Sequence, residues 1–231
     1  MALFRPGTVD VVTLASRTGP LCGQHVELLP MDLAFAADLA AAAAVDRTAY
    51  RYTVVPNGHD GAEAYVRGLL GDRDADRIVP FAQRHVATGR LVGCTRFMEI
   101  RRWRGRPDPD EVEIGGTWLS ADVQRSAVNT EAKLLMLTHA FETWNVGRVA
   151  LCTDERNERS RTAIERIGAR FEGILHNHRP SSFPGEAGRA RHTALFAITD
   201  TEWPVVRAHL RGRLAGRVPA RPDESAPASR S

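Results

Sequence analysis

The chain has 231 residues, 43% of them hydrophobic and 26% charged, which is ordinary for a single globular domain. The formal net charge is +3 and the basic residues are spread along the chain, which argues against a nucleic-acid binder. The longest apolar stretch, around Leu39 to Val45, is too short to span a membrane, so we expect no membrane partner.

Two further features bear on where the protein works. The three cysteines, Cys22, Cys94 and Cys152, show no metal-ligand spacing and are expected to be reduced thiols. The first residues, MALFRPGTVD, lack the charged start and apolar core of a secretory signal. Together these features predict a cytoplasmic protein.

Residues 1–20 mix Pro, Gly, Thr and Ser with the short apolar piece VDVVTLA, and predict an N-terminal arm that could add one strand. Alternating polarity and turn residues predict strands at 23–30, 78–88, 90–101, 111–119, 148–153, 170–176 and 191–199. Helical periodicity predicts helices at 32–45, 60–70, 129–145, 157–168 and 201–214. Residues 217–231 are polar and rich in Pro and Ser, so we expect disorder there. This order predicts an α/β or α+β domain, residues 21–216, on one mixed sheet.

The segment EIGGTWLSADVQRSAVNTEAK, from Glu113 to Lys133, predicts a strand, a short polar loop and the start of a helix. A second helix opens with an Asn cap in NERSRTAIERIGA. The first N–H groups of a helix are unpaired and carry the positive end of its dipole, so such a start binds anions. Two such units in tandem suggest an enzyme that holds a phosphorylated carrier and performs acid–base chemistry beside it.

Three pieces carry a resemblance to a known family: EIGGTWLSADVQRSAVNTEAK, HAFETWNVGRVALCTDERNERSRTAIERIGARFEGIL and the closing strand HTALFAIT. Over about residues 21–214 the chain resembles the GNAT acyltransferase superfamily, and most closely the branch of ribosomal-protein N-terminal acetyltransferases. The resemblance implies a mostly antiparallel mixed sheet flanked by helices. It also implies acetyl-CoA as the co-substrate.

The family's coenzyme loop has the pattern Gln/Arg-x-x-Gly-x-Gly/Ala. Here Gln124 occupies its first position, while Ala127 and Asn129 replace the two later residues. Since Ala is less free in φ than Gly, we expect negative φ at Ala127. The resemblance implies a cradle for the pyrophosphate formed by Gln124, Arg125, Ser126, Ala127, Val128, Asn129 and Thr130.

Lys133 is the only lysine among 31 basic residues. It is either a solvated helix lysine or a compact charge near a phosphate or a buried carboxylate, a role in which Arg is a poor substitute. On the second reading Lys133 belongs to the coenzyme site.

For the reaction, the resemblance implies direct attack of an amine on the thioester. Glu113 matches the strand position of the family's base, and Glu111, two residues earlier on the same face, is the fallback. The helix tyrosine that serves many relatives as the acid is replaced by Ile164. Ser160 matches a serine near the thiol, or bonds locally. Asn157 matches the residue that binds the pantetheine arm.

The acceptor side is less well defined. Tyr50, Arg51 and Tyr52 lie in a loop where the family builds one wall of the acceptor cleft. His178 and Arg179 precede the last hairpin, with His176 and His192 nearby, and we expect them to line the cleft. No Cys or Asp completes a ligand set with these histidines, so we expect no metal.

The sequence therefore predicts an N-acetyltransferase that moves acetyl from acetyl-CoA to a primary amine, either a protein N-terminus or a small amine. Another acyl-CoA such as succinyl-CoA, or a non-catalytic CoA-binding sensor, are the alternatives. A nucleic-acid binder that uses the Arg-rich end RAHLRGRLAGR is disfavoured. The protein is expected to be a monomer or a homodimer.

Overall fold

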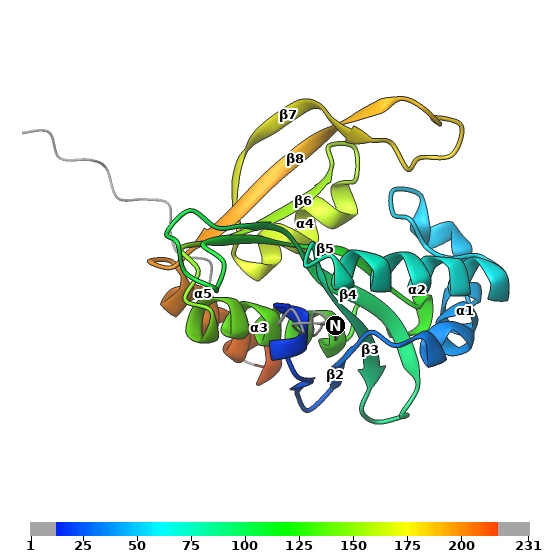
Figure 1. The fold of residues 1–231 in the computed structure, drawn as a ribbon, viewed down its shortest axis with the longest axis horizontal. Coiled ribbons are helices and arrows are strands. Elements are labelled where there is room, and N and C mark those ends of the chain that lie inside the picture. The colour runs from blue at the N-terminus through cyan, green and yellow to red at the C-terminus, as the bar shows by residue number, and fades with distance from the viewer. Residues whose placement is uncertain (1–12, 217–231) are drawn as a thin grey trace, which may run out of the picture.

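A single eight-stranded sheet runs through the computed structural model, which describes residues 13–216 (Figure 1). The spatial order is β1-β2-β3-β4-β5-β6-β8-β7. Every neighbouring pair is antiparallel except β5 and β6, which are parallel. The strands are β1 Leu21–Cys22, β2 Val26–Pro30, β3 Val79–His85, β4 Leu91–Arg101, β5 Glu111–Leu119, β6 Arg148–Asp154, β7 Arg170–Pro180 and β8 Ala190–Thr199. The predicted mixed, mostly antiparallel sheet is confirmed.

Helices cover both faces of this sheet, and each face has its own hydrophobic cluster. One cluster joins α3, α4 and α5 to the sheet, and the other joins α1 and α2 to the opposite face. Adjacent residues of β3 show the alternation, because Phe81 belongs to the first cluster and Ala82 to the second. The helices are α1 Ala36–Ala44, α2 Gly58–Asp74, α3 Ala127–Thr138, α4 Glu158–Ile167 and α5 Trp203–Leu214. Short 3-10 turns precede α1 and α3, and a π turn, His139–Thr143, continues α3.

The predicted boundaries differ from the structure at the first strand, at α2, at α3 and at the end of β7. We predicted one strand from Gly23 to Pro30, but the chain turns between β1 and β2. The carboxylate of Glu131 on α3, 6% exposed, causes this turn by accepting the backbone N–H groups of Gln24, His25 and Val26 at 2.9, 2.6 and 2.9 Å. Three N–H groups bound to a side chain cannot join a strand ladder at the same time. In α3, the Ser126 cap starts the helix two residues earlier than predicted.

Two positions in the central strands adopt left-handed backbone, and both mark irregular pairing. In β5, Gly116 has φ +56, and the register between β4 and β5 shifts beside it. The positive φ favours glycine at this position, and a Cβ on Gly116 would force the guanidinium of Arg96 on β4 to shift. In β4, Glu99 has φ 51 at a second register shift.

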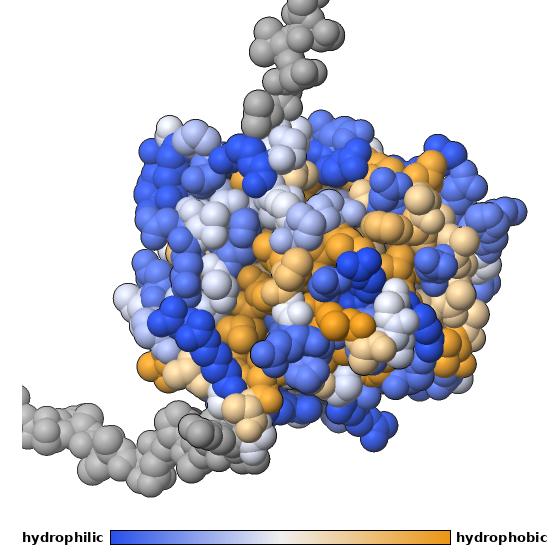
Figure 2. All heavy atoms as spheres, turned by 90° about the horizontal axis from the view of Figure 1, so that it is seen from below, coloured by the Kyte–Doolittle hydropathy of each residue, from blue (hydrophilic) through white to orange (hydrophobic). Residues whose placement is uncertain are grey.

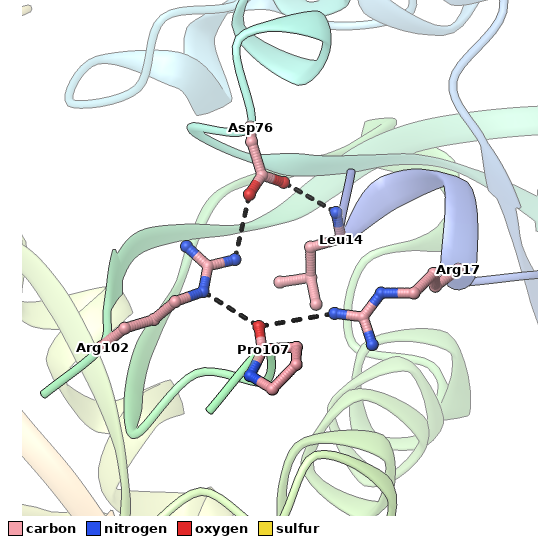
Figure 3. Close-up of a pocket in the computed structure, with 5 residues that line it drawn as sticks. All are labelled: Leu14, Arg17, Asp76, Arg102 and Pro107. Carbon is pink, nitrogen blue, oxygen red and sulfur yellow. Dashed lines mark hydrogen bonds and ion pairs between the residues drawn. The ribbon is translucent and has the colours of Figure 1, made fainter. Parts of the chain in front are cut away.

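The described N-terminal segment packs beside the α2–β3 turn and the β4–β5 loop. A cavity of about 420 Å³ lies there, lined by Leu14, Arg17, Asp76, Arg102 and Pro107 (Figure 3). Its polar groups satisfy one another: Asp76 accepts from the Leu14 N–H at 2.7 Å and from Arg102 at 3.0 Å, and both arginines reach the Pro107 carbonyl. This arrangement anchors the arm. The predicted extra strand in VDVVTLA extends into residues 1–12, and the predicted disordered tail is residues 217–231; both ranges lie outside the described part.

Figure 2 shows the side opposite the β7–β8 hairpin, where apolar residues lie in the middle and reach parts of the edge, interspersed with hydrophilic ones. Within residues 13–216, none of the helices combines the length and apolarity needed to cross a membrane.

Candidate active site

The parallel strands β5 and β6 pair only at their beginnings. Glu111, Val112 and Glu113 pair with Arg148, Val149 and Ala150. Beyond this point β5 continues to Leu119 and β6 to Asp154 with no further pairing between them. The two strands therefore separate, and the backbone of β5 after Glu113 faces an opening toward β6. Such an open strand edge can bind an extended ligand by main-chain hydrogen bonds.

The N-terminus of α3 lies at the end of β5. Ser126 caps the helix, its Oγ accepting the Val128 N–H at 3.3 Å. The left-handed residue of this loop is Arg125, with φ 61, and Ala127 is not among the residues with positive φ, as expected. The helix begins at Ala127, so its first N–H groups lie within the segment predicted to bind the pyrophosphate.

The N-terminus of α4 lies at the end of β6. Asn157 caps it, its Oδ1 accepting the Ser160 N–H at 3.1 Å. Among the described residues, neither the Asn157 amide NH₂ nor the Ser160 hydroxyl has a partner, so both are available to a ligand. Gln124 connects the two helix starts: its Nε2 donates to the Leu119 carbonyl at 2.9 Å and its Oε1 accepts from Arg159 on α4.

Glu113 is buried at the point where the strands separate. Its side chain is 4% exposed, and Arg179 of β7 donates to Oε1 at 2.9 Å and to Oε2 at 2.7 Å. Arg179 also donates to Glu99 at 3.2 Å. Cys152 of β6 lies beside this pair; burial and the negative charge of Glu113 raise the pKa of its thiol to about 12. The fallback residue Glu111 instead pairs with Arg148 at 3.3 Å, where the two strands still pair with each other.

The loop between α1 and α2 meets the loop between β7 and β8. The Tyr52 ring lies 5.1 Å from the Phe183 ring, and the Tyr52 carbonyl accepts from Ser182 Oγ at 3.0 Å. The guanidinium of Arg156 lies over both rings, 5.7 Å from Tyr52 and 5.2 Å from Phe183. Tyr50 points to β5, donating to the Leu119 carbonyl at 3.1 Å. Both predicted acceptor tyrosines thus lie on the α1–α2 side of the sheet, and Arg51 extends over Phe183.

The histidines lie on β7 and β8. His178 is exposed beside Arg179, and partial burial and the positive charge of Arg179 lower its pKa. His176 and His192 pack edge to face at 4.8 Å, and His192 Nδ1 accepts the Asn177 N–H at 3.0 Å. In the part of the chain that the structure describes, no three His, Cys, Asp or Glu side chains group as metal ligands do.

Lys133 points into the domain from α3. It is 5% exposed, and its Nζ donates to Thr117 Oγ1 at 2.7 Å and to Thr95 Oγ1 at 3.5 Å. The reading as a solvated helix lysine is therefore wrong. Its partners within residues 13–216 are hydroxyls, not a carboxylate, and burial lowers its pKa to about 7. Lys133 therefore joins α3 to β4 and β5 through the hydroxyls of Thr95 and Thr117.

Two features of the site were not predicted from the sequence. The first is the pairing of Glu113 with Arg179, which are 66 residues apart. The second is the pair Gly115–Gly116, which leaves space in β5 for the side-chain ends of Glu113, Met98 and Arg96. Adjacent glycines within a predicted strand are a signal for such close approach.

Comparison with known proteins agrees with this geometry. Residues 25–170 match the family "Acetyltransferase (GNAT) domain". Over 58 residues the chain is 38% identical to the "Putative ribosomal N-acetyltransferase YdaF" of Bacillus subtilis (strain 168), a match that covers 25% of this chain and 32% of that protein. It therefore spans only about a third of the length of that curated relative.

Two solved structures show how far the fold is shared. A GCN5-related N-acetyltransferase from Brucella melitensis superposes with a TM-score of 0.71 at 27% identity, covering 84% of each chain. Mycobacterium smegmatis RimJ, solved in complex with CoA-disulfide, superposes with a TM-score of 0.68 at 21% identity, covering 87% of this chain and 98% of RimJ. The family match over more than half of the sequence and the shared fold lead to one conclusion: this chain belongs to the GNAT acetyltransferase family.

Proposed function

We propose that this protein transfers an acetyl group from acetyl-CoA to a primary amine. The observation that carries the proposal is the opening between β5 and β6, which has a helix N-terminus at the end of each strand and a buried carboxylate at its base. An opening with this arrangement offers an extended ligand a strand edge and offers its phosphates the first N–H groups of a helix.

The residues present suit the coenzyme. The segment from Gln124 to Thr130, which includes the start of α3, would hold the pyrophosphate, because unpaired N–H groups and the helix dipole favour an anion there. The free amide NH₂ of Asn157 would bind the pantetheine arm. RimJ, which shares the fold, was solved with a CoA derivative, and this supports the choice of carrier.

In the reaction, the amine nitrogen forms a bond to the thioester carbonyl carbon, the bond from this carbon to sulfur breaks, and the thiolate leaves. The attacking amine loses a proton, and the thiolate takes one up. We assign the removal of the proton from the amine to Glu113. Arg179 occupies one lone pair on each of its oxygens, which leaves others for a water that carries the proton. We assign protonation of the leaving thiolate to the Ser160 hydroxyl, which has no partner among the described residues and regains its proton from solvent.

For the acceptor we propose an exposed amine such as a protein N-terminus. Several similar proteins are named ribosomal N-acetyltransferases or ribosomal-protein acetyltransferases, and this supports a peptide. Tyr50, Tyr52, His178 and Arg179 would line the cleft that admits it, between the α1–α2 loop and the β7–β8 hairpin.

The test has two stages. Coenzyme A should raise the melting temperature, whereas pantetheine, which lacks the pyrophosphate, should not. A panel of N-terminal peptides and small amines with acetyl-CoA should then release free thiol. No thermal shift with millimolar coenzyme A would refute the coenzyme assignment. Binding without turnover of any amine would instead favour a coenzyme-A sensor.

A further inference from the structure

A second arginine besides Arg179 lies close to Glu113 on the same face of the sheet. Arg96 of β4 pairs in register with Gly115 of β5, and Met98 pairs with Glu113. Because paired residues share a face and faces alternate along a strand, Arg96 and Glu113 point to the same side. This is the side covered by α1 and α2.

The guanidinium of Arg96 lacks a polar partner in the described part of the chain. Among residues 13–216 it makes no hydrogen bond and no ion pair, whereas Arg179 on the same face binds two carboxylates. It lies against the backbone of Gly116, at the place that a Cβ of this residue would occupy. Arg96 is partly exposed, so its five donors are within reach of a ligand.

The side chains next to Arg96 on this face are buried. Trp118 pairs in register with Cys94 and is 3% exposed, and the Tyr65 hydroxyl of α2 lies 3.1 Å from Cys94 Sγ. Burial raises the pKa of Tyr65, and the nearby charge of Arg96 opposes this rise. None of the described residues around Arg96 supplies it with an acceptor, so its donors are available to a ligand.

We propose that Arg96 binds a carboxylate carried by the amine acceptor, and so selects acidic acceptors. This inference rests on the proposed acetyltransferase function. A carboxylate matches the planar fork of a guanidinium, and it supplies the acceptors that the described residues around Arg96 lack. Gly115, opposite Arg96, lies two residues beyond Glu113, which is about 7 Å along the strand. The acidic group therefore lies within one or two residues of the reacting amine.

The carboxylate could belong to a small amino acid or to an acidic side chain near a peptide N-terminus. Two matched sets of acceptors separate these sources. The first set pairs β-alanine and glycylglycine with their carboxamides. The second set uses tetrapeptides that begin with Ala and carry Glu or Gln at the second or third position. The set in which the charged member is preferred identifies the source.

The wild-type enzyme should show a kcat/KM about tenfold or more higher for the charged member of a pair, since a charge-assisted hydrogen bond is lost in the neutral one. Arg96→Met should abolish this preference by raising KM for charged acceptors, while the KM for acetyl-CoA stays unchanged. Arg67→Met is the matched control, because Arg67 lies on α2 with its side chain 61% exposed and should leave the preference intact.

Several outcomes would overturn the inference. One is turnover by the wild type with equal kcat/KM for charged and neutral members in both sets. Another is an Arg96→Met enzyme that keeps the preference. If Arg96→Met gives no thermal shift with coenzyme A and is therefore misfolded, Arg96→Lys replaces it. Loss of the planar guanidinium should still reduce the preference for charged acceptors. An unchanged preference in Arg96→Lys would refute the inference.

Failure of the proposed function can be told apart from failure of this inference. If coenzyme A binds but no acceptor is acetylated, the acetyltransferase proposal fails. The same acceptors are then compared by thermal shift in the presence of coenzyme A. A shift that appears only with charged members and disappears in Arg96→Met supports the carboxylate site, and the absence of such a shift refutes it.

Discussion

Arg179 donates one hydrogen bond to each carboxylate oxygen of Glu113, and thereby joins β7 to the base of the opening between β5 and β6. Within this pair the Glu113 side chain is buried, with 4% of its surface exposed. Burying a carboxylate without a hydrogen-bonding partner is unfavourable, and Arg179 supplies that partner. The same contact fixes the direction in which the remaining lone pairs of Glu113 point.

The first prediction concerns Glu113 as the base. Glu113→Gln keeps the shape and one hydrogen bond to Arg179 but removes the acceptor for the proton. We expect kcat to fall by roughly 10²-fold, with the affinity for coenzyme A unchanged, and the rate to recover at alkaline pH as more of the amine is free. Steady-state kinetics across pH would check this, with Glu111→Gln as the control. If only Glu111→Gln lowers kcat, the base lies two residues earlier on the strand.

The second prediction concerns the charge of Lys133. Its pKa is lowered from the usual 10.5 to about 7, so between these values the unfolded chain holds a proton that the folded protein has lost. Stability should therefore rise with pH through this window, and the cost of burying the charge is fully present below pH 7. Lys133→Met should be more stable than wild type near pH 6, by up to several kcal/mol, with the difference shrinking toward pH 10. Urea unfolding at several pH values measures this. Equal pH slopes for the two proteins would contradict it.

The third prediction tests whether position 133 tolerates a cationic side chain that is larger than lysine. Arginine is larger and stays charged, so Lys133→Arg should lower the free energy of unfolding by at least about 1–3 kcal/mol through overpacking. It should also weaken coenzyme binding, because the larger guanidinium would displace Thr117 of β5, which accepts from Lys133 at 2.7 Å. The matched exchange Arg166→Lys, on the exposed side of α4, should do little. Wild-type stability and affinity in Lys133→Arg would show that this position has no special role.

The fourth prediction concerns Asp110, which is fully buried before β5. Burial alone would raise the pKa of Asp110, but hydrogen bonds from the Trp103 and Arg104 N–H groups and from the Arg104 and Arg106 side chains outweigh this and hold it well below its usual range. These hydrogen bonds therefore stabilise the folded protein at neutral pH, and this contribution is lost as acid protonates the Asp110 carboxylate. Asp110→Asn should lower the melting temperature at pH 7 and lower it less at pH 3. A variant as stable as wild type at pH 7 would refute this.

The fifth prediction concerns the contact between the two loops that border the acceptor side. Arg156→Met removes the guanidinium that lies over Tyr52 and Phe183 and that pairs with Asp154 and Glu186. We expect the KM for the acceptor to rise a few-fold while the KM for acetyl-CoA is unchanged. Arg77→Met is the control, because this side chain is 64% exposed and pairs with Asp72 at the C-terminal end of α2. A rise in the acetyl-CoA KM instead would place Arg156 on the coenzyme side.

Local chemistry accounts for the parts of the structure that the sequence predicted well. Asn157 and Gly168 bound α4 as expected, because an Asn cap and a glycine at φ +104 are signals contained in a few neighbouring residues. The bounds of β5 were predicted without error. The negative φ of Ala127 followed from the presence of its Cβ alone.

Contacts between distant segments account for the rest. Neither the partner of Glu113 nor the burial of Lys133 is visible in a local pattern, because Arg179 and Thr95 reach these residues only through the sheet. Pairing between distant segments also explains why β7 and β8 are longer than predicted. These strands pair with each other up to Pro180 and Ala190, past the polar residues at their predicted ends. The turn before β2 depends on Glu131, more than a hundred positions later.

The contact between Glu131 and the turn before β2 makes the amide exchange of this turn a measure of the stability of α3. The amide hydrogens of Gln24, His25 and Val26 are held by a side chain of α3, the helix whose first turn we assign to the coenzyme. They can exchange with solvent only when the Glu131 carboxylate withdraws, so their exchange rates follow the fluctuations of that helix. A ligand that steadies the start of α3 should slow deuterium uptake at residues 24–26, far away in sequence and on a segment it never touches.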